Sequence, residues 1–280
     1  MLESALCVQD SNIVQILLNA GSDSNPFVGY AGTPLQILST FGNCKLVLIL
    51  LDKGIDINAA AHNPSGGTAL QAAADNDHSE IVQFLQDKGA AVNATAANNA
   101  GRTVLQAAAG YGDIELVSIL SVWGDDINAR ASSDGGQTAS QAAAGIGNIE
   151  LVRILNDAGA DINCLAAKDD GVMVMQVAVE TGSIDLVQYL LDKNIGITDR
   201  VSLGSMLYSA LIHHKCSLKK VETLLNAGAD VNATTRFGSA LCLAVHSGNA
   251  SLVQCLMDEG VDLDGDGFGT LIQRSIQTLI

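Results

Sequence analysis

Acidic and imidazole side chains are the groups in this 280-residue chain whose types and spacing could do chemistry. The most regular spacing is DLDGDGFGTLIQ at residues 262–273, where Asp262, Asp264 and Asp266 alternate as the first ligands of a calcium-binding loop do. Such a loop needs a bidentate glutamate at its twelfth position, and Gln273 stands there. A glutamine amide does not supply that ligand, so we expect no metal site in this segment.

Histidine and cysteine gather in a second place, the run HHKC at residues 213–216. His213, His214 and Cys216 could supply ligands for zinc, with His246 farther along the chain. Zinc sites usually need four ligands that converge, whereas neighbouring histidines on one helix point in different directions. The sequence therefore predicts solvated turn residues here, and it predicts no metal and no cofactor.

General acid–base catalysis is another chemistry that these residue types allow. Five residues could take part if the fold brought them together: Asp75, Tyr111, Glu180, His213 and His246. They lie far apart in the sequence, and nothing in their spacing shows that they converge. No Ser-His-Asp or Cys-His arrangement occurs in a context that would activate a nucleophile. We predict no catalytic residues, and we keep enzyme activity as an alternative.

The elements that would have to position these groups follow from an internal repeat. A glutamine recurs every 35 residues, within segments such as TALQAAA at 68–74 and TVLQAAA at 103–109; the five positions are Gln36, Gln71, Gln106, Gln141 and Gln176. A fixed interval of that length indicates a repeated supersecondary unit. Each copy predicts a capped apolar helix, a glycine turn and a second apolar helix. One such pair cannot bury its own apolar faces, so the pairs must stack.

This pattern resembles the ankyrin repeat, which has Thr-Pro-Leu-His at its first helix, a glycine turn and Gly-Ala-Asp at its end. GTPLQ at 32–36 and GADIN at 159–163 carry the likeness, with glutamine in the usual histidine place. The resemblance covers nearly the whole chain. It implies an all-α solenoid of helix-turn-helix pairs with β-hairpin fingers, about seven full repeats plus partial ends. The Leu-Gln-Ala-Ala variant is most similar to ankyrin arrays of filamentous fungi.

The repeats predict one domain over residues 1–280. The copies fall at 1–25, 33–58, 68–93, 103–128, 138–163, 173–198, 205–232 and 239–264, with a partial copy at 270–280. Four consecutive fingers, between residues 59 and 172, are nine residues long, which either marks a site or reflects the period of this family. Solenoids need polar ends, and the apolar last copy therefore predicts continuation into a longer chain or end-to-end self-association.

The recurring glutamine has a predicted structural role. It lies one residue after a buried leucine, at the start of the first helix, where it faces the hairpin that links neighbouring copies. A glutamine amide both donates and accepts hydrogen bonds. We therefore expect it to tie the backbones of adjacent loops together.

Charge and composition narrow the class of partner. The net charge is −16, from 14 basic and 30 acidic residues, which disfavours nucleic acid and anionic membranes and favours a basic partner. No apolar run reaches the ~18–20 residues of a membrane helix, and no secretory signal opens the sequence. Six cysteines without paired spacing indicate reduced thiols. We expect an intracellular, cytoplasmic protein.

The resemblance implies that finger tips and the last turn of each first helix line a concave groove. Phe41, Tyr111 and Ile146 are bulky at groove positions that the core does not need, and aromatic anchors concentrate binding energy at interfaces. We therefore predict a non-catalytic module that binds a protein or peptide partner. The predicted contacts are Phe41, Asp75, Asn76, Arg102, Tyr111, Gln137, Ile146, Glu180, His213 and His246. The alternative is a small-molecule site or an unusual enzyme in the same groove.

Overall fold

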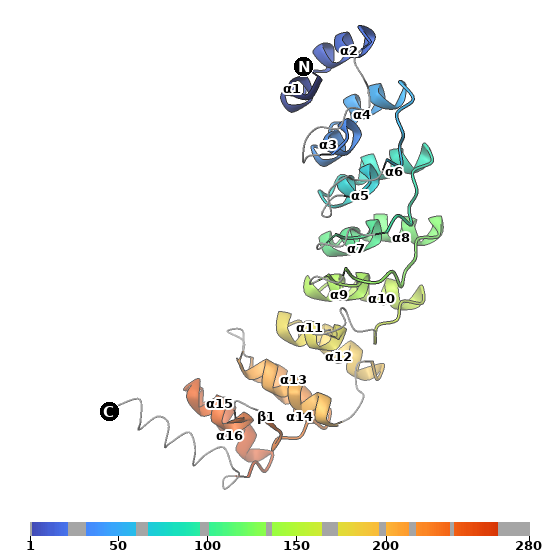
Figure 1. The fold of residues 1–280 in the computed structure, drawn as a ribbon. Helices are drawn as coiled ribbons and strands as arrows, with labels where there is room; N and C mark the ends of the chain where they lie inside the picture. Colours follow the sequence, from blue (N-terminus) through green and yellow to red (C-terminus); the bar gives the residue numbers. More distant parts are fainter. Residues whose placement is uncertain are drawn as a thin grey trace, which may run out of the picture. The chain divides into compact units, whose positions relative to one another are not determined.

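A computed structural model gives the fold of the chain, drawn in Figure 1. It describes residues 2–21, 32–59, 67–95, 101–132, 136–163, 173–195, 200–212, 217–235 and 238–262. The chain divides into two compact units. The first comprises Met1–Ile146 and Glu150–Gly171, and the second comprises Gly147–Ile149 and Val172–Ile280. The prediction of a single domain stays a prediction.

Helix pairs make up the described part of the first unit. They are α1 (Leu2–Val8) with α2 (Ser11–Asn19), α3 (Pro34–Thr40) with α4 (Cys44–Leu51), α5 (Ala69–Ala74) with α6 (Ser79–Asp87), α7 (Val104–Tyr111) with α8 (Ile114–Trp123), and α9 (Ala139–Gly145) with α10 (Ile149–Asp157). The first helices of successive pairs pack side by side, α1 on α3, α3 on α5, α5 on α7 and α7 on α9 (Figure 1).

The second unit continues the same pattern. Its pairs are α11 (Val174–Thr181) with α12 (Ile184–Asp192), α13 (Arg200–Ile212) with α14 (Leu218–Asn226), and α15 (Ala240–His246) with α16 (Ala250–Asp258). Before α15, β1 (Thr234–Thr235) and β2 (Gly238–Ser239) pair antiparallel, with Thr234 opposite Ser239, as expected for a finger. The predicted all-α solenoid architecture is confirmed. In the described ranges, no helix has the length and apolar character required to cross a bilayer.

Small side chains and helix caps explain why these short helices form and pack. Ala73, Ala108 and Ala143 in the middle of α5, α7 and α9 are at most 2% exposed, so neighbouring helices approach closely. A threonine caps each of four first helices in a capping box with the glutamine three residues later, namely Thr33 with Gln36, Thr68 with Gln71, Thr103 with Gln106, and Thr138 with Gln141. These caps satisfy backbone donors that a helix of two turns would otherwise leave unpaired.

The recurring glutamines link one loop to the next, as predicted. Oε1 of Gln106 accepts from the amide of Thr103 at 3.0 Å, while its Nε2 donates to the carbonyls of Ala129 and Arg130 at 3.0 and 3.2 Å. Gln36 and Gln71 make the equivalent contacts. Each accepts from the amide of its capping threonine, and each donates to a carbonyl of the following loop, at Ala59 and Ala94. Gln176 departs from the pattern, because its Nε2 donates to Glu180 within the same helix at 3.1 Å.

Asparagines at the ends of three successive repeats form a second line of contacts. Asn93 donates from Nδ2 to the carbonyl of Gly124 at 2.9 Å and accepts from the amide of Asp126 at 2.7 Å. Asn58 bonds to Gly89 and Ala91 in the same way, and Asn128 bonds to Gly159 and Asp161. Each of these three repeats therefore fixes the turn that closes the following one.

One buried cation interrupts the otherwise apolar positions of the second helices. Lys220 in α14 stands where α4, α8 and α16 have Leu46, Leu116 and Leu252, and it is only 1% exposed. Its Nζ donates to the carbonyl of Val179, near the C-terminal end of α11, at 2.7 Å. The C-terminal end of a helix carries partial negative charge, which favours a cation there.

Several sequence-based predictions concern residues outside the described ranges. They include His213, His214 and Cys216, most of the calcium-loop pattern at 262–273, and the apolar last copy at 270–280. Self-association and continuation into a longer chain therefore stay predictions. The thiols of Cys44, Cys242 and Cys255 are free.

Candidate functional site

A row of exposed side chains follows the C-terminal ends of the first helices in the first unit. We call it the C-terminal row, and its members are Val8, Phe41, Asn76, Tyr111 and Ile146. Each directly precedes the residue with positive φ that turns the chain into the second helix, at Gln9, Gly42, Asp77, Gly112 and Gly147. The helices that carry the row pack on one another in sequence order. Side chains from five successive repeats therefore share one register.

Four members of the C-terminal row are apolar or aromatic and exposed. Val8 is 72% exposed, Phe41 53%, and Tyr111 and Ile146 48% each. The fifth member, Asn76, is exposed and polar, and it donates from Nδ2 to the carbonyl of Ala72 at 2.8 Å. Apolar side chains repeated at one register are a stronger sign of an interaction surface than the same residues scattered singly.

Three of the predicted contact residues form one cluster in the middle of this row. Nε of Arg102 donates to Oδ1 of Asp75 at 2.8 Å, and the hydroxyl of Tyr111 donates to the backbone carbonyl of Asp75, also at 2.8 Å. The Arg102 guanidinium lies 5.7 Å from the centre of the Tyr111 ring, within the range of a cation–π contact. A hydrogen bond and a cation thus hold the half-exposed aromatic ring in place.

Gly110 makes room for this cluster. A β-carbon at that position would lie 3.1 Å from Nη1 of Arg102, closer than an ordinary van der Waals contact. The guanidinium therefore lies against the last turn of α7, where a larger residue would displace it. Arg102 comes from the loop before α7 and Asp75 from the end of α5, so the ion pair also connects two repeats.

Opposing effects act on the carboxyl group of Asp75. Partial burial raises its pKa above the usual range, and the charge and hydrogen bond of Arg102 act in the other direction. The side chains of Arg102 and Asp75 are 37% and 34% exposed, so solvent weakens the pair. The pair orients Tyr111 more than it stabilises the fold.

The other predicted contact residues have separate environments. Gln137 is exposed in the loop that precedes α9. Glu180 and His246 belong to the second unit, where Glu180 accepts from Gln176 and His246 is exposed as the last residue of α15. Among the described residues, the structure thus gathers Asp75, Arg102 and Tyr111 into contact, and it places Phe41, Asn76 and Ile146 at the equivalent helix ends.

The sequence reasoning missed Val8 as part of this surface. Residues 1–25 are the most divergent copy, and their helix turn uses Gln9 in place of glycine. Aligning that turn with Gly42 would have placed Val8 at the register of Phe41. The position of the turn could therefore have identified Val8 as a member of the row, although the residue type at the turn, Gln9, could not.

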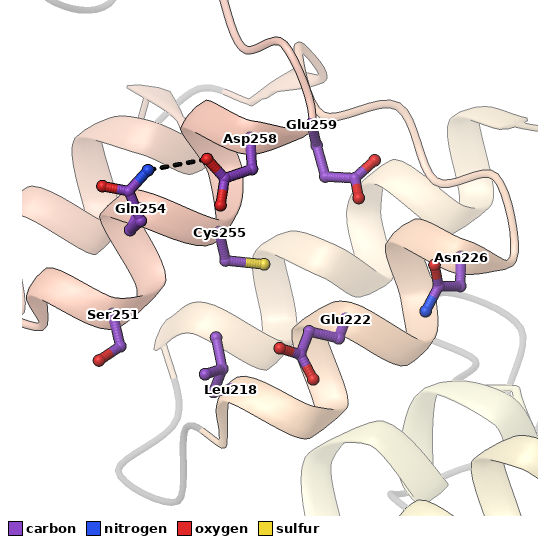
Figure 2. Close-up of a pocket in the computed structure, with 8 residues that line it drawn as sticks. All are labelled: Leu218, Glu222, Asn226, Ser251, Gln254, Cys255, Asp258 and Glu259. Carbon is purple, nitrogen blue, oxygen red and sulfur yellow. Dashed lines mark hydrogen bonds between the residues drawn. The ribbon is translucent and has the colours of Figure 1, made fainter.

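A shallow pocket lies between α14 and α16 in the second unit, and Figure 2 shows its lining. The thiol of Cys255 sits among the carboxylates of Glu222, Asp258 and Glu259, and Gln254 donates to Asp258 at 2.8 Å. Burial raises the pKa of the Cys255 thiol, and the three carboxylates raise it further. A thiol with a raised pKa carries little thiolate at neutral pH and is a poor nucleophile.

The two surfaces are a row of exposed side chains and an open depression. The Cys255 groove is an open depression between helices, whereas small-molecule sites are usually enclosed. Within the described ranges, no three His, Cys, Asp or Glu side chains are placed to hold a metal ion. The exposed row resembles a binding surface more than a reaction centre.

Comparison with known proteins identifies the family. The sequence model described as ankyrin repeats (3 copies) matches residues 59–131 and 124–201, about half of the chain. No curated protein matches the chain in sequence. The solved structure of the human ASB11 ankyrin repeat domain is similar with a TM-score of 0.66 and 21% identity, covering 82% of this chain and 99% of that domain. That likeness concerns the fold alone, and the fungal subgroup stays a prediction. Stacked helix pairs, their loop contacts and the matching model together show that the chain belongs to the ankyrin repeat family.

Proposed function

We propose that this protein is a non-catalytic interaction module that binds a protein or peptide partner through the C-terminal row. Ankyrin repeats are in general protein-interaction modules, and fold alone names no partner. The observation that supports the row is Tyr111, which Asp75 and Arg102 hold half-exposed between the repeats that carry Phe41 and Ile146. An aromatic ring fixed before binding loses little conformational entropy when a partner covers it.

Composition supports a basic partner. Acidic residues outnumber basic ones by 30 to 14, so a partner with the opposite charge would associate faster and be selected over acidic competitors. In the proposal, Gln137 at the loop before α9, and Glu180 and His246 at equivalent helix ends of the second unit, make further polar contacts. Free thiols at Cys44, Cys242 and Cys255 support a reducing, cytoplasmic location.

The double variant Tyr111→Ala/Ile146→Ala tests the proposal. Partners are captured from an extract of the native cells, the main one is purified, and its affinity is measured by calorimetry. We expect the double variant to weaken binding at least about 30-fold, since a central interface residue contributes about 2 kcal/mol or more. The helical circular dichroism should not change, because both side chains are half-exposed.

Val122→Ala is the matched control. Val122 is 85% exposed near the end of α8, in the same repeat as Tyr111 but outside the C-terminal row. This control should bind with wild-type affinity. Full binding by the double variant, or equal losses in the double variant and the control, would exclude the C-terminal row as the binding surface.

A further inference from the structure

Asp125 is a carboxylate at a position that most other repeats fill with apolar side chains. It follows the glycine that ends the second helix of its repeat. Six other repeats have an apolar residue in that place; Ile55, Ala90, Ala229 and Val261 are at most 9% exposed, and Ala160 and Ile195 are partly exposed. The position belongs to the junction between the second helix and the following finger, where Asp125 as a whole is half-buried, so a charged group there is unexpected.

Both carboxylate oxygens of Asp125 are buried and have no hydrogen-bond partner in the structure. The backbone amides of Asp126 and Leu105 lie near enough to favour the ionised form, but neither meets hydrogen-bond geometry with the carboxylate. Leu105 belongs to the first turn of α7, where backbone donors face outward. The carboxylate is therefore removed from water without receiving full replacement contacts.

The backbone around Asp125 is fixed on both sides. Asn93 of the preceding repeat bonds to the carbonyl of Gly124 and the amide of Asp126, and the amide of Asp125 itself donates to the carbonyl of Leu120 at 3.2 Å. Gly124 has φ of 79°, which only glycine adopts at low cost. These contacts fix the backbone that carries Asp125 between Leu120 and Asn93.

The charges around Asp125 do not offset its burial. The negative charge of Asp126, the next residue, repels that of Asp125. The Oδ1 atom of Asp126 accepts a hydrogen bond from the amide of Asn128 at 3.1 Å. The facing helix α7 has no charged side chain, and α8 has only Glu115, in the first turn at its far end. Arg130, the nearest cation in the following loop, is exposed. Burial, with a smaller contribution from Asp126, raises the pKa of Asp125 to about 6.

We propose that Asp125 makes the repeat formed by α7 and α8 sensitive to protons: the repeat is less stable when this carboxylate is ionised and more stable when it is protonated. The folded chain then binds a proton more tightly at this site than the unfolded chain does. The contribution of Asp125 to the free energy of unfolding is greatest below the ordinary pKa of 3.8, falls as pH rises from there, and reaches its lower level above about 6. The proposal rests on the fold and is independent of any partner.

Asp125→Ala tests the proposal, because alanine fills the same place at Ala90 and Ala229 and should fold without strain. Urea unfolding of the full chain is followed for wild type and variant at pH 7.5 and pH 5.0. We expect the variant to be the more stable at pH 7.5. The ratio of their unfolding equilibrium constants should shrink about tenfold at pH 5.0, from pKa values of about 6 folded and 3.8 unfolded.

Asp87→Ala serves as the control, because Asp87 is an exposed carboxylate at the end of α6 in the preceding repeat. Its ratio to wild type should stay the same at both pH values. Amide hydrogen exchange should also slow in α7 and α8 of Asp125→Ala at pH 7.5. The proposal is overturned if Asp125→Ala is less stable than wild type at pH 7.5, or if the ratio does not change with pH.

Discussion

At the scale of single residues, the glutamine near the start of α3, α5 and α7 has two tasks. Its oxygen completes the cap of its own helix, and its amide group reaches the loop of the next repeat. Gln106 is only 1% exposed, so removal of its side-chain amide would leave buried backbone groups without partners. Such groups are costly because water cannot replace the lost contact.

Gln106→Leu should therefore lower the free energy of unfolding by about 1–3 kcal/mol. Gln176→Leu is the matched control, because Gln176 donates to Glu180 in its own helix. Urea unfolding monitored by circular dichroism measures both variants. Equal losses would show that the bridge between loops contributes nothing beyond a local contact.

Residue-level prediction succeeded where a repeat fixed the environment. The period placed each glutamine at a helix start, and the register placed Phe41, Tyr111 and Ile146 at exposed helix ends. The ion pair of Arg102 with Asp75 could not be predicted from the sequence. The two residues come from different repeats, and the conformation of the loop before α7 sets the position of Arg102. Asp125 and Lys220 could have been found by comparing each residue with its equivalents, since both put a charge in an apolar column.

At the scale of elements, the turn between paired helices has two separate requirements for glycine. Gly42 has φ of 74°, and a β-carbon there would lie 2.6 Å from the imidazole of His78. His78 precedes α6 and donates from Nε2 to the carbonyl of Thr40, at the end of α3, at 3.0 Å. The turn thus accommodates a side chain that joins two neighbouring helix pairs.

Gly54 needs glycine for its backbone conformation alone. Its φ is nearly the same, 75°, but a β-carbon there would meet no atom within 4 Å. Gly54→Ala should cost about 1–2 kcal/mol, from the left-handed backbone alone. Gly42→Ala should cost about 1 kcal/mol more, since His78 must move and lose its hydrogen bond. Thermal unfolding of the two variants measures the difference. A Gly42→Ala that is no less stable than Gly54→Ala would show that His78 moves freely.

At the scale of the whole molecule, the excess of acidic residues should make stability depend on salt. Glu80, Glu115 and Glu150 lie exposed at the same position of three successive second helices, so like charges recur along the array. Repulsion between like charges destabilises a folded chain, and added salt screens it.

The melting temperature should therefore rise between about 0.05 and 0.5 M sodium chloride, over which the screening length falls several-fold. Scanning fluorimetry at fixed pH measures the rise. The triple variant Glu80→Gln/Glu115→Gln/Glu150→Gln should show a smaller rise, because it removes three of the repelling charges. A melting temperature that is independent of salt would mean that the negative charges are too far apart to interact.

The contacts made by Asn58, Asn93 and Asn128 have a consequence for how such a protein can change in length. Because each asparagine holds the turn one repeat ahead, excising residues 94–128 would bring Asn93 to the place of Asn128, opposite Gly159 and Asp161. Asn93 would then make the hydrogen bonds that Asn128 makes now, and the backbone groups of Gly159 and Asp161 would keep a partner. The backbone contacts therefore allow whole 35-residue modules to be gained or lost.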